Sequence, residues 1–290
     1  MSKFEFKAIG TDWVIDIMDY LSKDEEAVLL DKIKKRAEEF DITYSRFRGD
    51  SLVTKMSKTV GEYTLPDDAD KMISIYKKAY DLTHGLVTPL IGQVLVDAGY
   101  DEKYSLVKRE MTIPKKWEEV MEWKNPILKM LEPSILDFGA CGKGYLVDII
   151  SEIIEHDGIK SYTVDGSGDM RQRSVEGIEL RVGLEHPDDK EKVIGVIEIK
   201  NQSLCGSAGN RRKWADVHHI INPETLSSPK HILAVWVIAD DTITSDILTT
   251  CLFFVSPEIL QNDFKFEYLV LNNDFSVSKS EGFEVELFNS

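Results

Sequence analysis

Cysteine is scarce in this sequence. Its 290 residues include three cysteines, Cys141, Cys205 and Cys251, and an odd number excludes a framework in which every cysteine is paired within the chain. They lie in apolar or glycine-rich segments and lack the spacing of metal ligands. We therefore expect reduced, buried thiols in a cytoplasmic protein.

Long apolar runs are also absent. No stretch approaches the roughly 18 apolar residues of a membrane-spanning helix, so we expect no membrane span. Residues 1–7 contain no basic region followed by an apolar run, and we expect neither a signal peptide nor a lipoprotein leader. No linker rich in proline, glycine or serine is long enough to divide the chain. Residues 1–290 are therefore predicted to form one domain.

Positive charge is in deficit. The sequence has 35 lysine and arginine residues against 51 aspartate and glutamate residues, a formal net charge of −16. Nucleic acids and anionic membranes bind basic surfaces, so this balance argues against both as general partners and favours simple solubility. The apolar share of 42% predicts a well-formed core rather than a disordered chain.

Helix signals gather early in the chain and strand signals later, which predicts an α+β fold with mixed or antiparallel sheets and flanking helices. The expected helices cover residues 22–40, 66–84, 144–156, a segment from about 244, and a short segment near 258. The expected strands cover residues 4–17, 162–165, 178–183, 193–199 and 232–238, with a closing hairpin through 272–274.

The late apolar helix carries two oxygen-bearing side chains on one face. Asp246 and Thr250 are four residues apart, so a helix presents both to one point. Such hard oxygens suit Mg²⁺, which takes few protein ligands and leaves room for phosphate oxygens. The alternative is that Asp246 only caps the helix start.

Several glycine-rich segments can be interpreted in two ways. Residues 136–148 predict a strand, a small-residue loop and a helix, so Lys143 and the helix N-terminus form either an anion site or a plain turn. This segment is neither a Walker P-loop nor a GxGxxG motif. Residues 165–169 are typical of a turn, whereas residues 203–212 pair a flexible loop with two arginines that suit phosphate or simply face solvent. Residues 218 and 219 are both histidine, and in a strand only one of them faces a given site.

Taken in order, these segments resemble the ApbE family of Mg²⁺-dependent FAD:protein FMN transferases over nearly the whole chain. The matching segments are Ile-Gly-Thr at 9–11, Ser-Arg-Phe-Arg-Gly-Asp-Ser at 45–51, Leu-Asp-Phe-Gly-Ala-Cys-Gly-Lys-Gly-Tyr at 136–145 with the Asp at 148, Ser-Gly-Asp at 167–169, His-Ile-Ile-Asn-Pro-Glu-Thr at 219–225 and Ser-Asp-Ile-Leu-Thr-Thr at 245–250.

The resemblance implies roles for individual residues. It implies Mg²⁺ ligands at the following positions: Asp246, Thr250, the neighbouring Thr249 and the backbone carbonyl of Ala140. It implies FAD contacts at Ile9, Phe47, Leu86, Val87, Thr88, Asp137, Lys143 and Ile220. Asp246 and His219 are the expected catalytic residues, with His219 either a proton shuttle or a group that orients the pyrophosphate.

The implied activity is transfer of FMN from FAD to a threonine or serine hydroxyl of an acceptor protein, with release of AMP. The acceptor would carry a segment of the type Ser/Thr-Gly-Ala-Ser/Thr. This chain departs from the family pattern at Thr88, Asn222, Leu226 and residues 206–208. An FAD-binding or slowly FAD-hydrolysing protein without efficient transfer is therefore the alternative function.

Overall fold

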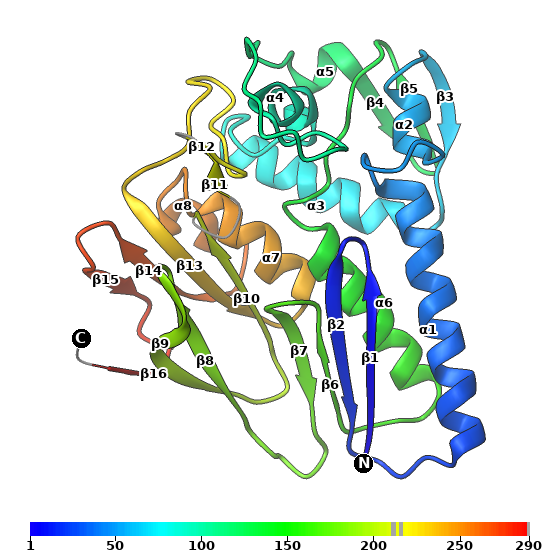
Figure 1. The fold of residues 1–290 in the computed structure, drawn as a ribbon, viewed down its shortest axis with the longest axis vertical. Coiled ribbons are helices and arrows are strands. Elements are labelled where there is room, and N and C mark those ends of the chain that lie inside the picture. The colour runs from blue at the N-terminus through cyan, green and yellow to red at the C-terminus, as the bar shows by residue number, and fades with distance from the viewer. Residues whose placement is uncertain (210–212, 215–216, 289–290) are drawn as a thin grey trace.

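The computed structural model describes residues 1–209, 213–214 and 217–288 (Figure 1). Its largest feature is an eight-stranded sheet with the order β1-β2-β6-β7-β10-β13-β14-β15. Every neighbouring pair in this sheet is antiparallel. The strands are β1 (Ser2–Ala8), β2 (Thr11–Ile17), β6 (Tyr162–Asp165), β7 (Asp169–Arg173), β10 (Ser203–Ala208), β13 (Ile232–Ala239), β14 (Glu267–Asn272) and β15 (Val277–Lys279).

The chain begins with a hairpin. β1 and β2 pair along their whole length, and the turn residues Ile9 and Gly10 have positive φ angles of 45° and 74°. The single interrupted strand expected over residues 4–17 is thus two strands. The alternation of apolar and polar residues continues across the turn because both strands bury the same face of the hairpin. On that face Phe4 lies opposite Ile15, and both are buried.

Helices cover one face of the large sheet (Figure 1). α6 packs on β6 and β7, α7 packs on β10 and β13, α1 lies against α6 and β1, and α3 lies against α7. The capping pattern at residue 22 is confirmed. The Ser22 hydroxyl accepts from the backbone N–H of Glu25, and the Glu25 carboxylate accepts from the backbone N–H of Ser22 at 2.8 Å. The helices are α1 (Lys23–Tyr44), α3 (Ala69–Leu82), α6 (Gly142–His156) and α7 (Thr242–Cys251).

A three-stranded sheet covers part of the other face. Leu204 and Trp236 of the large sheet pack in one apolar cluster with Leu184 and Ile197 of the small sheet. The neighbouring Cys205 points the opposite way, with its Sγ 3.6 Å from the carbonyl of Thr242 in α7. The small sheet has the order β16-β9-β8 and contains β8 (Leu180–His186), β9 (Asp189–Ile199) and β16 (Val285–Leu287).

Short elements complete the structure at the α3 end of the large sheet. Most of them were not expected from the sequence, because these particular short segments show no clear hydrophobic period. They are α2 (Leu52–Met56), η1 (Pro89–Ile91), α4 (Gly92–Ala98), α5 (Trp117–Val120), β3 (Gly61–Thr64), β4 (Met121–Lys124), β5 (Ile127–Met130), β11 (Lys213–Trp214) and β12 (Val217–His218). The expected short helix near residue 258 is present as α8 (Pro257–Gln261).

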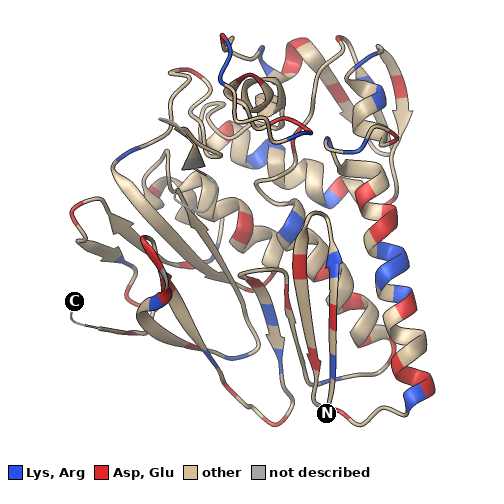
Figure 2. Ribbon diagram, viewed as in Figure 1, with Lys and Arg blue, Asp and Glu red and all other residues tan. Residues whose placement is uncertain are grey.

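The expected α+β class is confirmed by this arrangement of antiparallel sheets with helices on one side. Figure 2 shows lysines and arginines distributed among acidic residues, most clearly along α1. Within the described residues, no helix is long and apolar enough to cross a membrane.

Candidate functional site

A cavity of about 130 Å³ opens where α3, α4, β10 and the end of α7 meet, and we call it the central cavity. It brings together residues predicted from five separate sequence segments. The predicted residues in its wall are Phe47, Leu86, Val87, Thr88, Asp137, Ala140, His219, Ile220 and Thr250. The other predicted residues, Ile9, Lys143, Asp246 and Thr249, do not line it.

A buried arginine organises one wall of the central cavity. The Arg46 side chain is 3% exposed; its Nε donates to the Asp137 carboxylate, and its Nη1 donates to the carbonyl of Tyr100 at 2.9 Å. The guanidinium lies 4.0 Å from the centroid of the Phe47 ring. Asp137 also accepts from the backbone of Gly139 at 2.8 Å, so this carboxylate fixes both the arginine and the small-residue loop.

Tyr76 holds the same loop from α3. Its buried hydroxyl donates to the carbonyl of Asp137 at 3.1 Å and accepts from the backbone N–H of Ala140 at 3.2 Å. Burial raises the pKa of Tyr76 well above its ordinary value, and the nearby Cys141 and Asp137 raise it further. The hydroxyl therefore stays protonated and keeps the loop in place.

Asp246 is not the cap of α7. The cap is Asp241, whose side chain accepts from the backbone of Thr244 at 3.1 Å. Asp246 lies one turn further along, is 6% exposed, and accepts from the backbone N–H of Gly144 at 2.8 Å. The capping interpretation of Asp246 is therefore wrong, and the N-terminal turn of α6 is bonded to a carboxylate of the protein itself.

Gly144 is required by this close approach of α6 to α7. A Cβ on Gly144 would lie 2.4 Å from the carbonyl oxygen of Thr242 and 2.6 Å from the Cβ of Asp246. The contact is reciprocal, because Asp148 of α6 accepts from the backbone N–H groups of Thr242 and Ile243, each at 2.9 Å. Each helix thus supplies a carboxylate to the other, which fixes where Asp246 lies.

A second carboxylate and a lysine complete the charged cluster beside the central cavity. Asp169 of β7 is 1% exposed, lies next to Asp246, and has its Oδ2 2.5 Å from the Nζ of Lys143. Lys143 is thus paired within the protein. Burial lowers the pKa of Lys143, but the charges of Asp169 and Asp246 outweigh burial and raise it overall. Burial, followed by the charge of Asp169, raises the pKa of Asp246 well above its ordinary value.

This cluster has the chemistry of a divalent-cation site. Two buried carboxylates side by side with one lysine favour an additional cation, and Thr250 contributes a hydroxyl to the adjoining cavity wall. The Thr249 hydroxyl is fully buried and already donates to the carbonyl of Asp246 at 2.7 Å. Among the described residues, no group of three or more His, Cys, Asp or Glu residues could hold a metal, so a cation at this cluster would need hydroxyl, carbonyl or substrate oxygens as further ligands.

The two adjacent histidines face different surroundings, as expected. His218 is buried against Phe253, and its Nε2 lies 3.1 Å from the carbonyl of Pro229. His219 is half-buried and lines the central cavity together with Thr250. His219, and not His218, is therefore the histidine in the wall of that cavity.

Asp169, Tyr76, Arg46 and Ser207 belong to the site but were not predicted as site residues. Ser207 lines the central cavity, and its Oγ is 2.7 Å from the Oγ1 of Thr249. Asp169 and Arg46 had a sequence signal because they lie within segments that carry the family resemblance, and Ser207 lies in the 203–212 segment singled out above; Tyr76 had none. The flexible loop expected over residues 203–212 is wrong for residues 203–208, which form β10, and the two arginines at positions 211 and 212 lie outside the described residues.

Ile9 lies away from the central cavity, in the β1–β2 turn, where it packs against the main core. That turn is attached to the β6–β7 turn, because Thr11 Oγ1 donates to Ser167 Oγ at 2.6 Å.

The departures from the family pattern have local roles. Thr88 accepts from the backbone of Leu90 at 3.2 Å and so caps η1, and Leu226 has a positive φ of 53° where the family usually has glycine.

The fold is shared with solved flavin transferases. The ApbE protein of Thermotoga maritima superposes with a TM-score of 0.81 at 19% identity, covering 97% of each chain. The flavin transferase ApbE of Vibrio cholerae superposes with a TM-score of 0.78 at 18% identity, again covering 97% of each chain. These likenesses define the architecture.

The family follows from the sequence comparison. The model of the ApbE family matches residues 9–265, so the chain belongs to the ApbE family. A relative from Escherichia coli K12, named FAD:protein FMN transferase, is 24% identical over 275 residues, which cover 88% of this chain and 78% of that protein. The family membership predicted from the ordered motifs is confirmed.

Proposed function

We propose that this protein transfers FMN from FAD to a serine or threonine hydroxyl of an acceptor protein and releases AMP. Family membership and the names of the curated relatives support the transferase activity. The observation that carries the proposal is the buried Asp246–Asp169–Lys143 cluster directly behind a cavity wall that contains Thr250 and His219. With a divalent cation bound, such a cluster would suit a reaction in which negative charge develops on phosphate oxygens.

FAD is the substrate, and the central cavity would hold part of it. Pockets for drug-sized ligands usually measure about 300–1,000 Å³, so a cavity of about 130 Å³ takes one end of a dinucleotide while the rest extends outward. Phe47 and Tyr100 contribute aromatic surface to the cavity wall, and Leu86 and Val87 add apolar contact for a planar heterocycle. The buried Arg46, paired with Asp137, lies against Phe47 and helps to fix this wall.

The chemical step exchanges one phosphorus–oxygen bond for another. The acceptor hydroxyl oxygen bonds to the phosphorus of the FMN half, the bond from that phosphorus to the bridging oxygen breaks, and AMP leaves with the bridging oxygen. The hydroxyl proton is released, and His219 is the side chain in the cavity wall suited to accept it. Orientation of the pyrophosphate by His219 is the alternative role.

The residues present suit Mg²⁺. Asp246, Thr250, Thr249 and the carbonyl of Ala140 would hold it, and the adjacent Asp169 would add negative charge. When bound, Mg²⁺ would offset charge on the pyrophosphate and polarise the phosphorus. The chain itself supplies the position: Gly144 and Asp148 lock α6 to α7, and Tyr76 fixes the Ala140 loop.

The alternative is FAD binding with slow hydrolysis, favoured by the replacement of the family's aspartate at Thr88, whose hydroxyl is engaged in capping η1. FAD consumption with Mg²⁺, with and without a peptide containing Ser-Gly-Ala-Thr, separates the two functions. We expect the peptide to accelerate AMP release. If AMP release is equal with and without the peptide and free FMN is the only flavin product, the protein is a hydrolase; if FAD stays intact, it is a binding protein.

A further inference from the structure

β10 extends beyond its neighbour β7 in the large sheet. The β7–β10 ladder ends with Asp169 opposite Cys205, whereas β10 remains paired with β13 as far as Ala208. β7 stops there because Ser167 and Gly168, both with positive φ, turn the chain back into β6, closed by a 2.8 Å bond from Gly166 to the carbonyl of Asp169. Among the described residues, the end of β10 therefore has a neighbouring strand on one side only, and we call the open side the β10 notch.

The backbone groups that face the β10 notch can be assigned from two hydrogen bonds. Gln172 of β7 donates to the carbonyl of Gln202, and Gly209 donates to the carbonyl of Leu233 on the β13 side. Because hydrogen-bonding direction alternates along an antiparallel strand, even-numbered residues of this segment bond toward β7 and odd-numbered ones toward β13. The N–H and C=O groups of Ala208 therefore point into the β10 notch.

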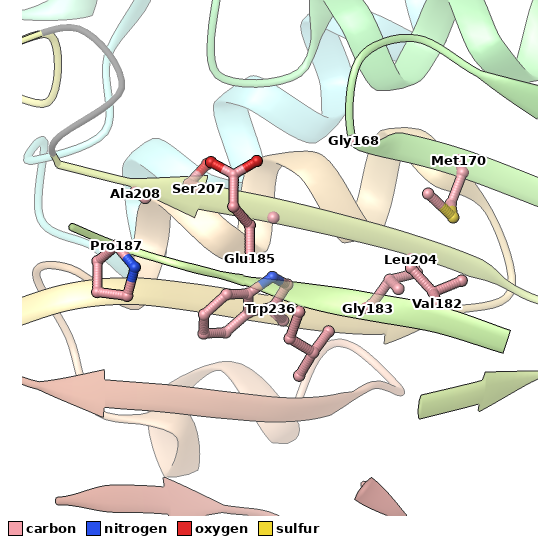
Figure 3. A pocket seen from close by; sticks show the side chains of 12 residues that line it. Gly168, Met170, Val182, Gly183, Glu185, Pro187, Leu204, Ser207, Ala208 and Trp236 are labelled. Atoms are coloured by element: carbon pink, nitrogen blue, oxygen red, sulfur yellow. The ribbon is translucent and has the colours of Figure 1, made fainter. Parts of the chain in front are cut away.

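The side chains beside the β10 notch point to two different cavities. Ser207 faces α7, where it contacts Thr249 and lines the central cavity. Gly206 and Ala208 face the small sheet and line a second cavity of about 100 Å³, which Ser207 also borders and which we call the Trp236 cavity. Figure 3 shows Ala208 and Trp236 in its wall. Trp236 lies directly over Gly206, because a Cβ on Gly206 would be 2.9 Å from the indole ring.

We propose that the acceptor protein binds as an extended segment that adds a short antiparallel strand in the β10 notch. Its hydroxyl residue lies opposite Ser207, and the residue before it lies opposite Ala208, with which it exchanges backbone hydrogen bonds. Side chains opposite one another in an antiparallel pair are about 5 Å apart on the same face. The acceptor hydroxyl is thereby directed past Ser207 toward Thr250 and His219 in the central cavity. This inference rests on the proposed FMN transfer.

The same geometry predicts a size limit on the acceptor sequence. The residue before the hydroxyl residue points toward the Trp236 cavity, whose wall includes Gly183, Gly206, Leu204 and Trp236. A cavity of about 100 Å³, lined by glycines and apolar side chains together with Ser207 and Glu185, accepts a small side chain and excludes a large one. Specificity would then come from the backbone and one small pocket, as in other cases of strand addition.

N-methylated peptides test the β10 notch on the unaltered protein. The probe is a peptide containing Ser-Gly-Ala-Thr, whose final threonine is the acceptor, and both anisotropy-detected binding and FMN transfer are measured with FAD and Mg²⁺. N-methylation of the alanine removes the N–H that bonds to Ala208 and should lower affinity and transfer by about tenfold or more. The matched control is N-methylation of the threonine, whose N–H points away from β10, and this should change both by less than about threefold. The proposed strand register is wrong if both N-methylated peptides lose binding and transfer equally, or if methylation of the threonine has the larger effect.

The protein variant Ala208→Pro provides the complementary test, since it removes a donor that faces the β10 notch and leaves the β13 ladder its bonds. We expect loss of peptide transfer by about tenfold or more with FAD affinity unchanged. Should this variant fail to fold, the peptide pair on the unaltered protein still decides. Suppose that the parent peptide binds, and that N-methylation weakens binding at the alanine but not at the threonine, yet no FMN is transferred. The β10 notch is then supported as the peptide site, and the proposed function is wrong. If the parent peptide does not bind, or Ala208→Pro folds and transfers normally, the notch is excluded.

Discussion

Asp246 in α7 accepts a 2.8 Å hydrogen bond from the backbone of Gly144 in α6, across 102 positions of the sequence. This bond sets the carboxylate at the N-terminal turn of α6, where the helix dipole favours negative charge. It also removes Asp246 from any capping role in its own helix, because Asp241 has that role. The stability of α7 and the charge of the candidate metal site can therefore be altered separately.

Asp246→Asn should abolish turnover and preserve the fold. Asparagine has nearly the same shape and can still accept from Gly144, but it removes the charge needed for a divalent cation. Mutation of residues that only orient metal ligands typically lowers metal affinity or activity by about 10–100-fold. Asp246 would be a ligand itself, so we expect FAD turnover to fall by more than about a hundredfold. The control is Asp241→Ala, which should lower the free energy of unfolding by about 1 kcal/mol through loss of the cap. Wild-type turnover by Asp246→Asn, measured as AMP release, would remove Asp246 from the site.

Lys143→Met should make the stability of the protein depend on Mg²⁺. Without the ammonium, Asp169 and Asp246 lie side by side without a cation, so we expect a loss of about 3 kcal/mol in the free energy of unfolding. Millimolar Mg²⁺ should restore part of this loss, because it binds only the folded site. Lys77→Met, which breaks an exposed pair with Asp81, should change stability by less than about 1 kcal/mol. Urea unfolding of each variant with and without Mg²⁺ measures these changes. If the unfolding curve of Lys143→Met is the same with and without Mg²⁺, the cluster is not a cation site.

FAD binding should be coupled to Mg²⁺. The pyrophosphate would approach a wall backed by Asp169 and Asp246, and only an added cation makes that approach favourable. Calorimetry should show FAD affinity rising by about tenfold or more when Mg²⁺ is present. Equal affinity under both conditions would mean that no metal bridges the protein and the two phosphates.

The three cysteines should be unreactive in the folded protein. Burial raises the pKa of all three thiols, that of Cys251 to about 12. A thiol reagent at pH 8 should therefore label none of them in the native protein and three after denaturation. The folded chain keeps these protons, whereas the unfolded chain releases them above about pH 8.5, so the free energy of unfolding should decline as pH rises beyond that value. Rapid labelling of any cysteine in the native state would contradict this burial.

The helix carrying Asp246 and Thr250 could be predicted from local spacing, because residues four apart share a helix face whatever surrounds them. Asp169 could not be assigned a role in this way. It follows a two-residue turn that resembles an ordinary hairpin, and its partners Lys143 and Asp246 belong to α6 and α7. The alternative that Asp246 caps α7 is wrong for a related reason: the expected start of α7, at about residue 244, lies two residues after the observed start at Thr242.

The helices and strands with a clear hydrophobic period were predicted within a few residues, for example residues 162–165 and 232–238. The β10 notch could not be predicted from hydrophobic periodicity. It depends on how far β7 and β10 extend relative to one another, and that length difference arises from the turn at Ser167 and Gly168. Periodicity predicts strands but does not fix where one strand ends beside another.

The central claim is that FMN passes from FAD to an acceptor hydroxyl. The most direct measurement incubates the protein with FAD, Mg²⁺ and the Ser-Gly-Ala-Thr peptide, then counts AMP by chromatography and locates FMN on the peptide by tandem mass spectrometry. We predict equal molar amounts of AMP and flavinylated peptide, with the FMN phosphoryl group on the final threonine. AMP accompanied only by free FMN, or FAD left intact while bound to the protein, would contradict the account.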